Sequence, residues 1–367
     1  MEGKILTNIY NFNAGPSALP KSVLLEAQES MFNYKNSGLS VMEMSHRSPL
    51  YEEIHFNSLN KLRSLLSVPD DFEILFLQGG ASLQFAMIPM NFLTPGKQAA
   101  FVLSGSWSEK AWKEASRIGE TYILASTKDE MYRRIPEVNF DSCKENTAYI
   151  HLTSNNTIFG TQWPSYPIKD PNIPVCMDAS SDILSRSIDW NQMDLVYAGA
   201  QKNAGPSGIT IVIIRKSLME TANSHIPTIL SYNTHAKSDS LYHTPPTGSI
   251  FILGLVMKWI EEQGGVEAMR LHSKTKGSLL YQTIDESDGF YVGHATESSR
   301  SSMNVTFNLR NEQLEKQFLH EAKAKGFVGL NGHRSIGGCR ASIYNAVPLS
   351  HVESLVEFMK NFQKTHV

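Results

Sequence analysis

A lysine among small residues is the first feature of this sequence that indicates chemistry. Lys202 lies in the segment Ala198-Gly-Ala-Gln-Lys-Asn-Ala-Gly-Pro-Ser-Gly208, between apolar runs at 194–199 and 209–214. This pattern predicts two strands joined by a glycine-rich turn. A lysine near other cations or in a desolvated pocket has a lowered pKa, and its neutral amine can form a Schiff base with a carbonyl. A lone loop lysine is more often simply solvated, so the suggestion of an aldehyde cofactor depends on other residues.

A carboxylate ends the short apolar run before this lysine. Asp178 closes the segment Ile173-Pro-Val-Cys-Met-Asp178. In pyridoxal phosphate enzymes an Asp pairs with the protonated ring nitrogen and keeps the ring able to absorb a carbanion. An Asp between a strand and a loop is also common as a helix N-cap, and the sequence leaves both interpretations open.

A glycine pair indicates a phosphate site. Gly79 and Gly80 separate an apolar run from a predicted helix. The free N–H groups and the dipole of a helix N-terminus attract phosphate, so Ala81 and Ser82 are candidates for this contact. The pair alone is equally typical of a tight strand-to-helix turn.

Two further residues follow apolar runs and suit a flat ring. Trp107 comes after the run at 99–103, and its indole could stack on a heteroaromatic cofactor. Thr157 comes after the run at 148–152 and could donate a hydrogen bond to a phenolic oxygen. Taken singly, Trp107 could equally be a core residue and Thr157 would carry no information.

The elements that must position these residues are short strands that alternate with helical patterns such as 108–116. The predicted strands lie near residues 73–77, 99–103, 121–125, 148–152, 174–178, 194–198 and 209–214. Such alternation predicts an α/β fold, with a mainly parallel seven-stranded sheet covered by helices on both faces. The candidate residues fall at or just after strand ends, where open α/β sheets bind ligands.

The pattern changes after residue 265. A strand at 302–308, a helix at 312–325, a glycine-rich stretch at 326–340 and a last helix from about residue 350 predict a smaller α+β domain. The most apolar stretch, 249–260, contains Lys258 and is predicted to be a buried helix that ends at a glycine pair.

Composition favours a globular protein without a nucleic-acid or membrane partner. The chain has 367 residues, of which 41% are hydrophobic, and 33 Lys and Arg balance 36 Asp and Glu to a formal charge of −3. Three cysteines without metal-ligand spacing favour a reducing compartment and predict no metal site. The N-terminus has no long apolar segment, so we expect a cytoplasmic protein.

Several motifs together resemble the phosphoserine aminotransferases, a family in the class V group of fold-type-I pyridoxal phosphate enzymes, over nearly the whole chain. The motifs are Asn11-Phe-Asn-Ala-Gly-Pro-Ser17, Met44-Ser-His-Arg-Ser48, Gln78-Gly-Gly-Ala-Ser82, Gly105-Ser-Trp107, Ala200-Gln-Lys-Asn203 and Asn331-Gly-His-Arg-Ser335. The resemblance implies a large cofactor domain at 16–264 and a small domain formed by 1–15 with 265–367.

The resemblance also assigns expected roles around pyridoxal 5′-phosphate. Lys202 would form the Schiff base, Asp178 would pair with the pyridine nitrogen, Trp107 would stack on the ring and Thr157 would contact its hydroxyl. The phosphate would be held by Ala81, Ser82 and Gln201 and, from the second subunit of a homodimer, by Asn233 and Thr234.

Substrate residues follow from two His-Arg pairs and one further arginine. The guanidinium fork matches carboxylate and phosphate oxygens in a bidentate manner. The resemblance implies that Arg340 binds the α-carboxylate, while the distal anionic group is received by His46, Arg47, His333 and Arg334.

The implied activity is a ping-pong transamination between glutamate and 3-phosphooxypyruvate that yields O-phospho-L-serine and 2-oxoglutarate in serine biosynthesis. A related reaction of 4-phosphohydroxythreonine in pyridoxine biosynthesis is also implied. Some members of the family have an arginine directly after the glycine-rich turn, at the position where this chain has Ser82. That departure leaves open how the substrate phosphate is held, and whether His235 or Lys237 compensates.

The sequence is also compatible with two other functions. A related class V enzyme, such as an alanine-glyoxylate aminotransferase or a cysteine desulfurase, would share the fold and the lysine. A desulfurase needs a nucleophilic loop cysteine, for which Cys339 is the one candidate near a substrate segment. A cofactor-binding or regulatory protein without catalytic activity is the alternative from a different class.

Overall fold

The computed structural model describes residues 9–366 except 168, 169 and 171. Its largest element is a seven-stranded sheet with the order β2-β10-β9-β8-β5-β3-β4. The strands are β2 (Phe72–Leu77), β3 (Gln98–Leu103), β4 (Thr121–Ser126), β5 (Thr147–Thr153), β8 (Val175–Asp178), β9 (Leu195–Gly199) and β10 (Thr210–Arg215). Only β10 runs antiparallel to its neighbours, so the predicted mainly parallel sheet is confirmed.

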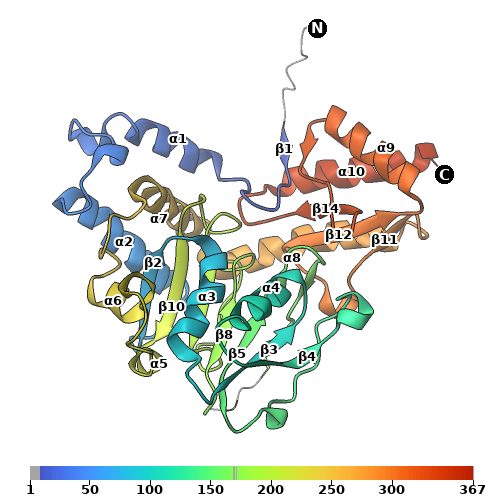
Figure 1. Ribbon diagram of the computed structural model, residues 1–367. Helices are drawn as coiled ribbons and strands as arrows, with labels where there is room; N and C mark the ends of the chain where they lie inside the picture. Colours follow the sequence, from blue (N-terminus) through green and yellow to red (C-terminus); the bar gives the residue numbers. More distant parts are fainter. Residues whose placement is uncertain (1–8, 168–169, 171, 367) are drawn as a thin grey trace.

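Helices cover both faces of this sheet, as Figure 1 shows. Alternate side chains of each strand point to opposite faces: Ile74 and Phe76 join one hydrophobic cluster, whereas Leu75 and Leu77 join another. The first cluster includes residues of α1 (Lys21–Ser30), α2 (Pro49–Leu65) and α7 (Thr247–Glu262), and the second includes residues of α3 (Gly80–Phe92) and α4 (Ser106–Ala115). Because both faces are covered, most strands are continuous apolar runs.

The short helices α5 (Lys216–Glu220) and α6 (Tyr232–Lys237) follow β10, and the long helix α8 (Gly265–Asp285) follows α7. The part of the chain that follows α8 builds a separate sheet and core. Its strands are β11 (Tyr291–Gly293), β12 (Asn304–Leu309) and β14 (Cys339–Ser342), in antiparallel pairs. Figure 1 shows α9 (Glu312–Ala324) and α10 (Leu349–His366) beside this sheet.

The N-terminal segment joins this second part of the structure. The short strand β1 (Tyr10–Asn11) pairs in parallel with β13 (Phe327–Val328), and Phe12 lies in the same hydrophobic cluster as Phe327. The domain division predicted from the sequence stays a prediction, and residues 1–8 of its N-terminal part lie outside the described residues.

Among the described residues, no helix is long and apolar enough to cross a bilayer. The predicted apolar helix at 249–260 is part of α7, whose inner side chains, such as Ile250 and Leu253, are fully buried.

Candidate active site

A cavity of about 290 Å³ lies where several strands of the large sheet end. Its wall comes from the segments after β2, β3, β5, β8 and β9, together with the N-terminal segment and β14. The residues that line it are Ala14, Gly15, Gly80, Ala81, Ser82, Trp107, Thr157, Ile158, Asp178, Ser180, Gln201, Lys202, His333 and Arg340. The sheet therefore brings together residues that are far apart in the sequence.

The amine of Lys202 points into this group. Its Nζ donates a hydrogen bond of 2.8 Å to Thr157 Oγ1 and lies 5.2 Å from the centre of the Trp107 ring. Burial lowers the pKa of Lys202 to about 8; the charge of Asp178 opposes this shift and that of Arg340 adds to it. About a tenth of the amine is therefore neutral and nucleophilic at pH 7, far more than for an ordinary lysine.

Asp178 places a buried carboxylate at the end of β8. Its Oδ1 accepts a hydrogen bond of 2.9 Å from the backbone N–H of Ser180. Burial raises the pKa of Asp178, although the charge of Lys202 opposes that shift. The residues that follow form turns and no helix, so the N-cap alternative is wrong, although the carboxylate does cap one N–H of the turn.

The glycine pair forms a tight turn that leaves the N-terminus of α3 open to a phosphate. Gly79 has a φ of +85°, and a Cβ on it would lie 2.6 Å from Leu83 Cδ2, so only glycine fits this turn. The first N–H groups of a helix have no partner within the helix. Gly80, Ala81 and Ser82 therefore present this helix end to the cavity.

The N-terminal segment was missed as part of the site. The backbone N–H of Ser17 donates a 3.0 Å hydrogen bond to Gln201 O, and Ser17 Oγ donates to Lys202 O. A Cβ on Gly15 would lie 3.2 Å from Lys202 Cγ. The motif at 11–17, which carries part of the family resemblance, is the sequence signal for this wall of the cavity.

The second sheet contributes the cationic side of the cavity. Arg340 lies on β14, and its Nη1 donates to Thr157 O at 3.4 Å. His333 comes from the loop before β14, with Nδ1 2.7 Å from Ser335 Oγ. Burial lowers the pKa of His333, and the positive charges of Arg340, Lys110 and Arg334 act in the same direction. An anion would relieve this repulsion.

Five predicted site residues do not line the cavity in this single chain: His46, Arg47, Asn233, Thr234 and Arg334. His46 and Arg47 lie just before α2, and Arg47 is exposed. On α6, Asn233 Nδ2 donates a 3.0 Å hydrogen bond to Met219 O. Arg334 is near enough for its charge to affect His333.

The structure also shows where His235, Lys237 and Cys339 lie relative to the cavity. His235 Nε2 lies 2.8 Å from Ile229 O, and neither His235 nor Lys237 lines the cavity. Cys339 is fully buried within β14, and burial raises the pKa of its thiol. Cys339 thus lacks the exposure of a nucleophilic loop cysteine.

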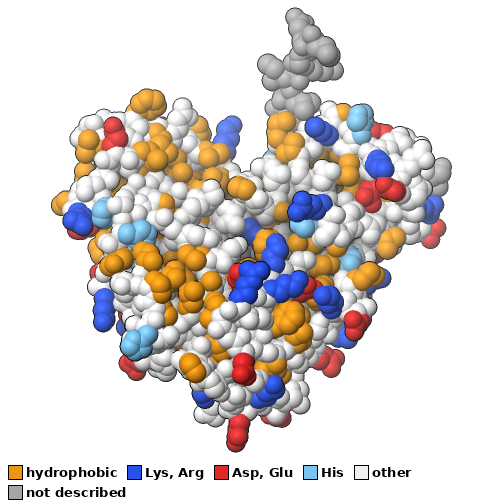
Figure 2. Space-filling view, viewed as in Figure 1, with side chains coloured by type: hydrophobic (Ala, Val, Ile, Leu, Met, Phe, Trp, Pro, Cys, Tyr) orange, Lys and Arg blue, Asp and Glu red, His pale blue; other side chains and the backbone are white. Residues whose placement is uncertain are grey.

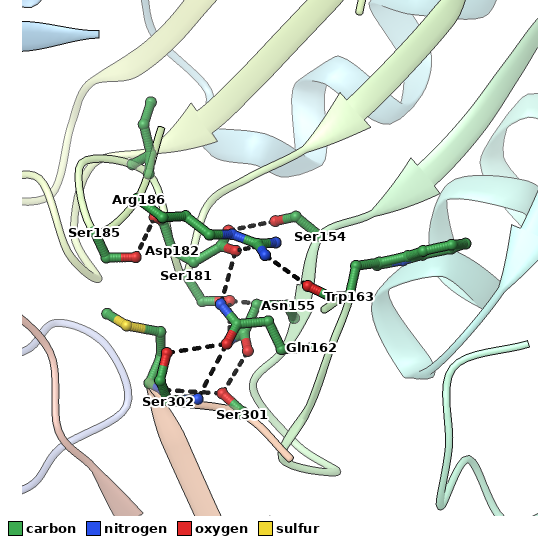
Figure 3. A network of polar contacts seen from close by, with 12 residues as sticks. Ser154, Asn155, Gln162, Trp163, Ser181, Asp182, Ser185, Arg186, Ser301 and Ser302 are labelled. Atoms are coloured by element: carbon green, nitrogen blue, oxygen red, sulfur yellow. Dashed lines mark hydrogen bonds and ion pairs between the residues drawn. The ribbon is translucent and has the colours of Figure 1, made fainter. Parts of the chain in front are cut away.

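A buried polar network lies around Asp182, in the turn that follows β8 (Figure 3), and its member Ser154 also donates a hydrogen bond from Oγ to Asp178 O. Asp182 accepts hydrogen bonds from Ser154 Oγ and, at 3.1 Å, from Gln162 Nε2, and it forms an ion pair of 3.1 Å with Arg186. Gln162 Oε1 accepts from both N and Oγ of Ser302, each at 3.0 Å. The network joins the large sheet to the segment that leads into β12, which pairs with the strand carrying Arg340.

The arrangement fits the cofactor expected from the sequence. Two buried donors at the cavity, Trp107 Nε1 and Arg340 Nε, have no partner within the described part of the chain. A lysine of lowered pKa, a buried carboxylate, a hydroxyl and a helix N-terminus correspond to the aldehyde, ring nitrogen, phenolic oxygen and phosphate of pyridoxal 5′-phosphate.

Comparison with known proteins agrees with this geometry. The family model described as Aminotransferase class-V matches residues 9–355. A phosphoserine aminotransferase of Lysinibacillus sphaericus (strain C3-41) is 58% identical over 360 residues, which cover 97% of this chain and 98% of that protein.

Solved structures are similar as well. One, of a phosphoserine aminotransferase studied for radiation damage of its Schiff base, has a TM-score of 0.95 and 57% identity and covers 98% of this chain and 99% of the other. A phosphoserine aminotransferase from Trichomonas vaginalis with bound pyridoxal phosphate has a TM-score of 0.90 and 36% identity, over 96% of this chain and 100% of the other.

Proposed function

This chain belongs to the class V aminotransferases, and we propose that it transfers the amino group between glutamate and 3-phosphooxypyruvate, giving O-phospho-L-serine and 2-oxoglutarate. It is a transaminase that depends on pyridoxal 5′-phosphate. The observation that carries the substrate proposal is the cavity in which Lys202 and Asp178 lie together with His333 and the cationic Arg340.

Each cofactor residue has a proposed contact. Lys202 would attach the cofactor, Asp178 would pair with its ring nitrogen, Trp107 would stack on the ring and Thr157 would bind its hydroxyl. The N-terminus of α3 at Ala81 and Ser82, together with Gln201, would bind the phosphate. When bound, the cofactor supplies an electron-poor ring that stabilises negative charge at the substrate α-carbon.

Residues of the chain would move the proton and orient the substrate. Lys202 Nζ would accept the proton from the substrate α-carbon, and its pKa of about 8 suits general-base work near neutral pH. The guanidinium of Arg340 would hold the α-carboxylate in bidentate geometry and so orient the α-carbon toward this amine.

The distal group of the substrate would meet His333 and Arg334. His46 and Arg47 do not reach the cavity of their own chain. In the proposed homodimer, these two residues would serve the cavity of the second subunit, as Asn233 and Thr234 are predicted to do for the cofactor phosphate. Cytoplasmic location, the role in serine biosynthesis and the related step in pyridoxine biosynthesis are parts of the same proposal.

The activity is tested by incubating the holoenzyme with O-phospho-L-serine and 2-oxoglutarate and measuring glutamate. Turnover is expected, with L-serine a far weaker donor because it lacks the distal anion. Equal rates with the two donors would contradict the proposed substrate. Borohydride treatment followed by peptide mapping should place the cofactor label on Lys202, and a label elsewhere would refute the proposed attachment.

The homodimer is tested by complementation. Arg47→Ala and Lys202→Ala subunits are each expected to be inactive as homodimers. If Arg47 serves the second subunit, mixed dimers should regain activity in one of two cavities, whereas no recovery after verified subunit exchange would contradict the arrangement. Arg334→Ala with Lys202→Ala is the control, because Arg334 is proposed to serve its own chain and mixing should restore nothing.

A further inference from the structure

We propose that Lys110 is a further specificity-determining residue of this cavity, whose ammonium attracts the phosphate at the distal end of the substrate. The proposal rests on the proposed function and adds a residue that neither the motifs nor the cavity wall includes. Lys110 lies on α4, one helical turn after Trp107.

The first support is geometric. Lys110 Nζ lies 4.2 Å from the centre of the Trp107 ring, and Lys202 Nζ lies 5.2 Å from the centre of the same ring. Trp107 lines the cavity. The cation–π contact therefore holds the Lys110 ammonium against the ring of a residue that lines the cavity, and the flexible stem of Lys110 allows it to move toward an incoming anion.

The second support is the accumulation of positive charge. Lys110, Arg334 and Arg340 each lower the pKa of His333, and no carboxylate opposes them there. Figure 2 shows Lys and Arg side chains, with Asp and Glu atoms between them, gathered near the middle of the face where Figure 1 places α4. Positive charges that gather around a histidine at one side of a cavity, and disfavour its charged form, are typical of an anion subsite.

The other lysines nearby do not share this environment. Lys113, on the same helix, lies 3.7 Å from Glu109 Oε2, and Lys128 lies 3.2 Å from Glu109 Oε1. Lys110 has no carboxylate within 4.0 Å among the described residues, from Ile9 to His366 with their gaps. Its charge is therefore available to a ligand.

The third support is the uncharged side chain of Ser82 at the N-terminus of α3. Ser82 carries no charge, so the helix end beside the glycine pair has no cationic side chain at this position. His235 and Lys237, the two compensating residues considered from the sequence, do not line this cavity. Lys110 provides a cation near the rim from a different element.

The charges of the two substrates predict which of them Lys110 favours. A phosphate monoester carries a charge near −1.5 to −2 at neutral pH, whereas the distal carboxylate of glutamate carries −1. Lysine acts as a compact point charge without the planar fork that favours carboxylates. Lys110 should therefore favour the phosphorylated substrate over glutamate.

The test compares Lys110→Met with Lys113→Met as the matched control. For the holoenzyme at low salt, kcat/KM for O-phospho-L-serine should fall about 1.5- to fivefold in Lys110→Met, the range of an exposed charge pair. For glutamate the fall should be smaller. The loss should shrink in 0.5 M KCl, because salt screens exposed charges. Lys110→Arg should retain most of the activity, and Lys113→Met should behave like the wild type.

A second measurement separates this proposal from the proposed function. If the wild type converts O-phospho-L-serine but the kcat/KM ratio of the two substrates is unchanged in Lys110→Met, the role of Lys110 is refuted and the function stands. If the wild type does not convert O-phospho-L-serine, the function fails. Binding of inorganic phosphate to the holoenzyme then tests Lys110 without turnover: weaker binding in Lys110→Met supports the anion subsite, and equal binding refutes it.

Discussion

Lys202 and Thr157 meet directly in the cavity, where Lys202 Nζ donates a hydrogen bond of 2.8 Å to Thr157 Oγ1. The threonine follows the end of β5 and the lysine follows β9, so the large sheet creates this contact. The aldehyde and the hydroxyl of pyridoxal phosphate are on adjacent ring carbons. The short distance between amine and hydroxyl therefore suits residues proposed to contact those two neighbouring groups.

The lowered pKa of Lys202 predicts a pH-dependent stability in the cofactor-free protein. Between pH about 8, the folded-state pKa, and 10.5, the ordinary value, the unfolded chain binds more protons at this residue than the folded chain. Stability should therefore rise with pH across this window. Urea unfolding at pH 7 to 10 should show a steeper rise in the wild type than in Lys202→Met, because buried Lys276, with a pKa lowered to about 7, adds a rise to both proteins. Parallel pH profiles would show that the lysine has an ordinary pKa.

Asp178→Asn should separate stability from function. Burial raises the pKa of Asp178 in the free protein, so removing the charge should leave the free energy of unfolding unchanged or slightly higher. Turnover should fall about 10²-fold, because a charge-assisted hydrogen bond to the ring nitrogen is lost. Denaturation of the cofactor-free protein and steady-state rates of the holoenzyme measure the two effects. A large loss of stability in the cofactor-free protein would contradict this prediction.

Asp182→Asn, unlike Asp178→Asn, should lower the free energy of unfolding. Asp182 is 2% exposed and pairs with Arg186, whose side chain is 16% exposed. Removing one partner of a buried ion pair leaves the other uncompensated and costs about 3 kcal/mol or more. Urea unfolding should show this loss, with Asp178→Asn, four residues earlier, as the control. Equal stability of the two variants would mean that the network in Figure 3 contributes little.

Gly332→Ala should disturb the loop that carries His333 and Arg334. A Cβ at this position would overlap the carbonyl oxygen of Gly337, which is backbone and has little room to move. KM for O-phospho-L-serine should rise at least tenfold, while the cofactor absorbance remains. Gly337→Ala is the control: nothing lies within 4 Å of its added Cβ, and its φ of +68° predicts only about 1 kcal/mol of strain. Unchanged kinetics in Gly332→Ala would show that the loop adapts freely.

The sequence was sufficient to predict the large sheet. Each of the seven predicted strands is present, because covered strands are continuous apolar runs bounded by turn residues. The strand order and the reversed direction of β10 were not predicted. Both depend on which strands pair across the sheet, and local patterns do not report that pairing.

The sequence also predicted residues that the cavity brings together, including Trp107, Thr157, Asp178 and Lys202. Their common signal was a polar or aromatic residue at the end of a strand. The roles of these residues stay proposals. Gly15 was missed because its contact with Lys202 joins distant segments, and Lys110 was missed because an exposed helical lysine has no distinctive local pattern.

The pairing of β1 with β13 has a consequence for protein synthesis. Tyr10 lies opposite Phe327, a separation of 317 positions (327 minus 10). Ala14 and Gly15, which line the cavity with Lys202, are among the first residues to leave the ribosome, yet the strand just before them cannot pair until nearly the whole polypeptide has been translated. The pocket therefore gains its last wall only near the end of translation, and unfinished chains would be unable to hold the coenzyme firmly.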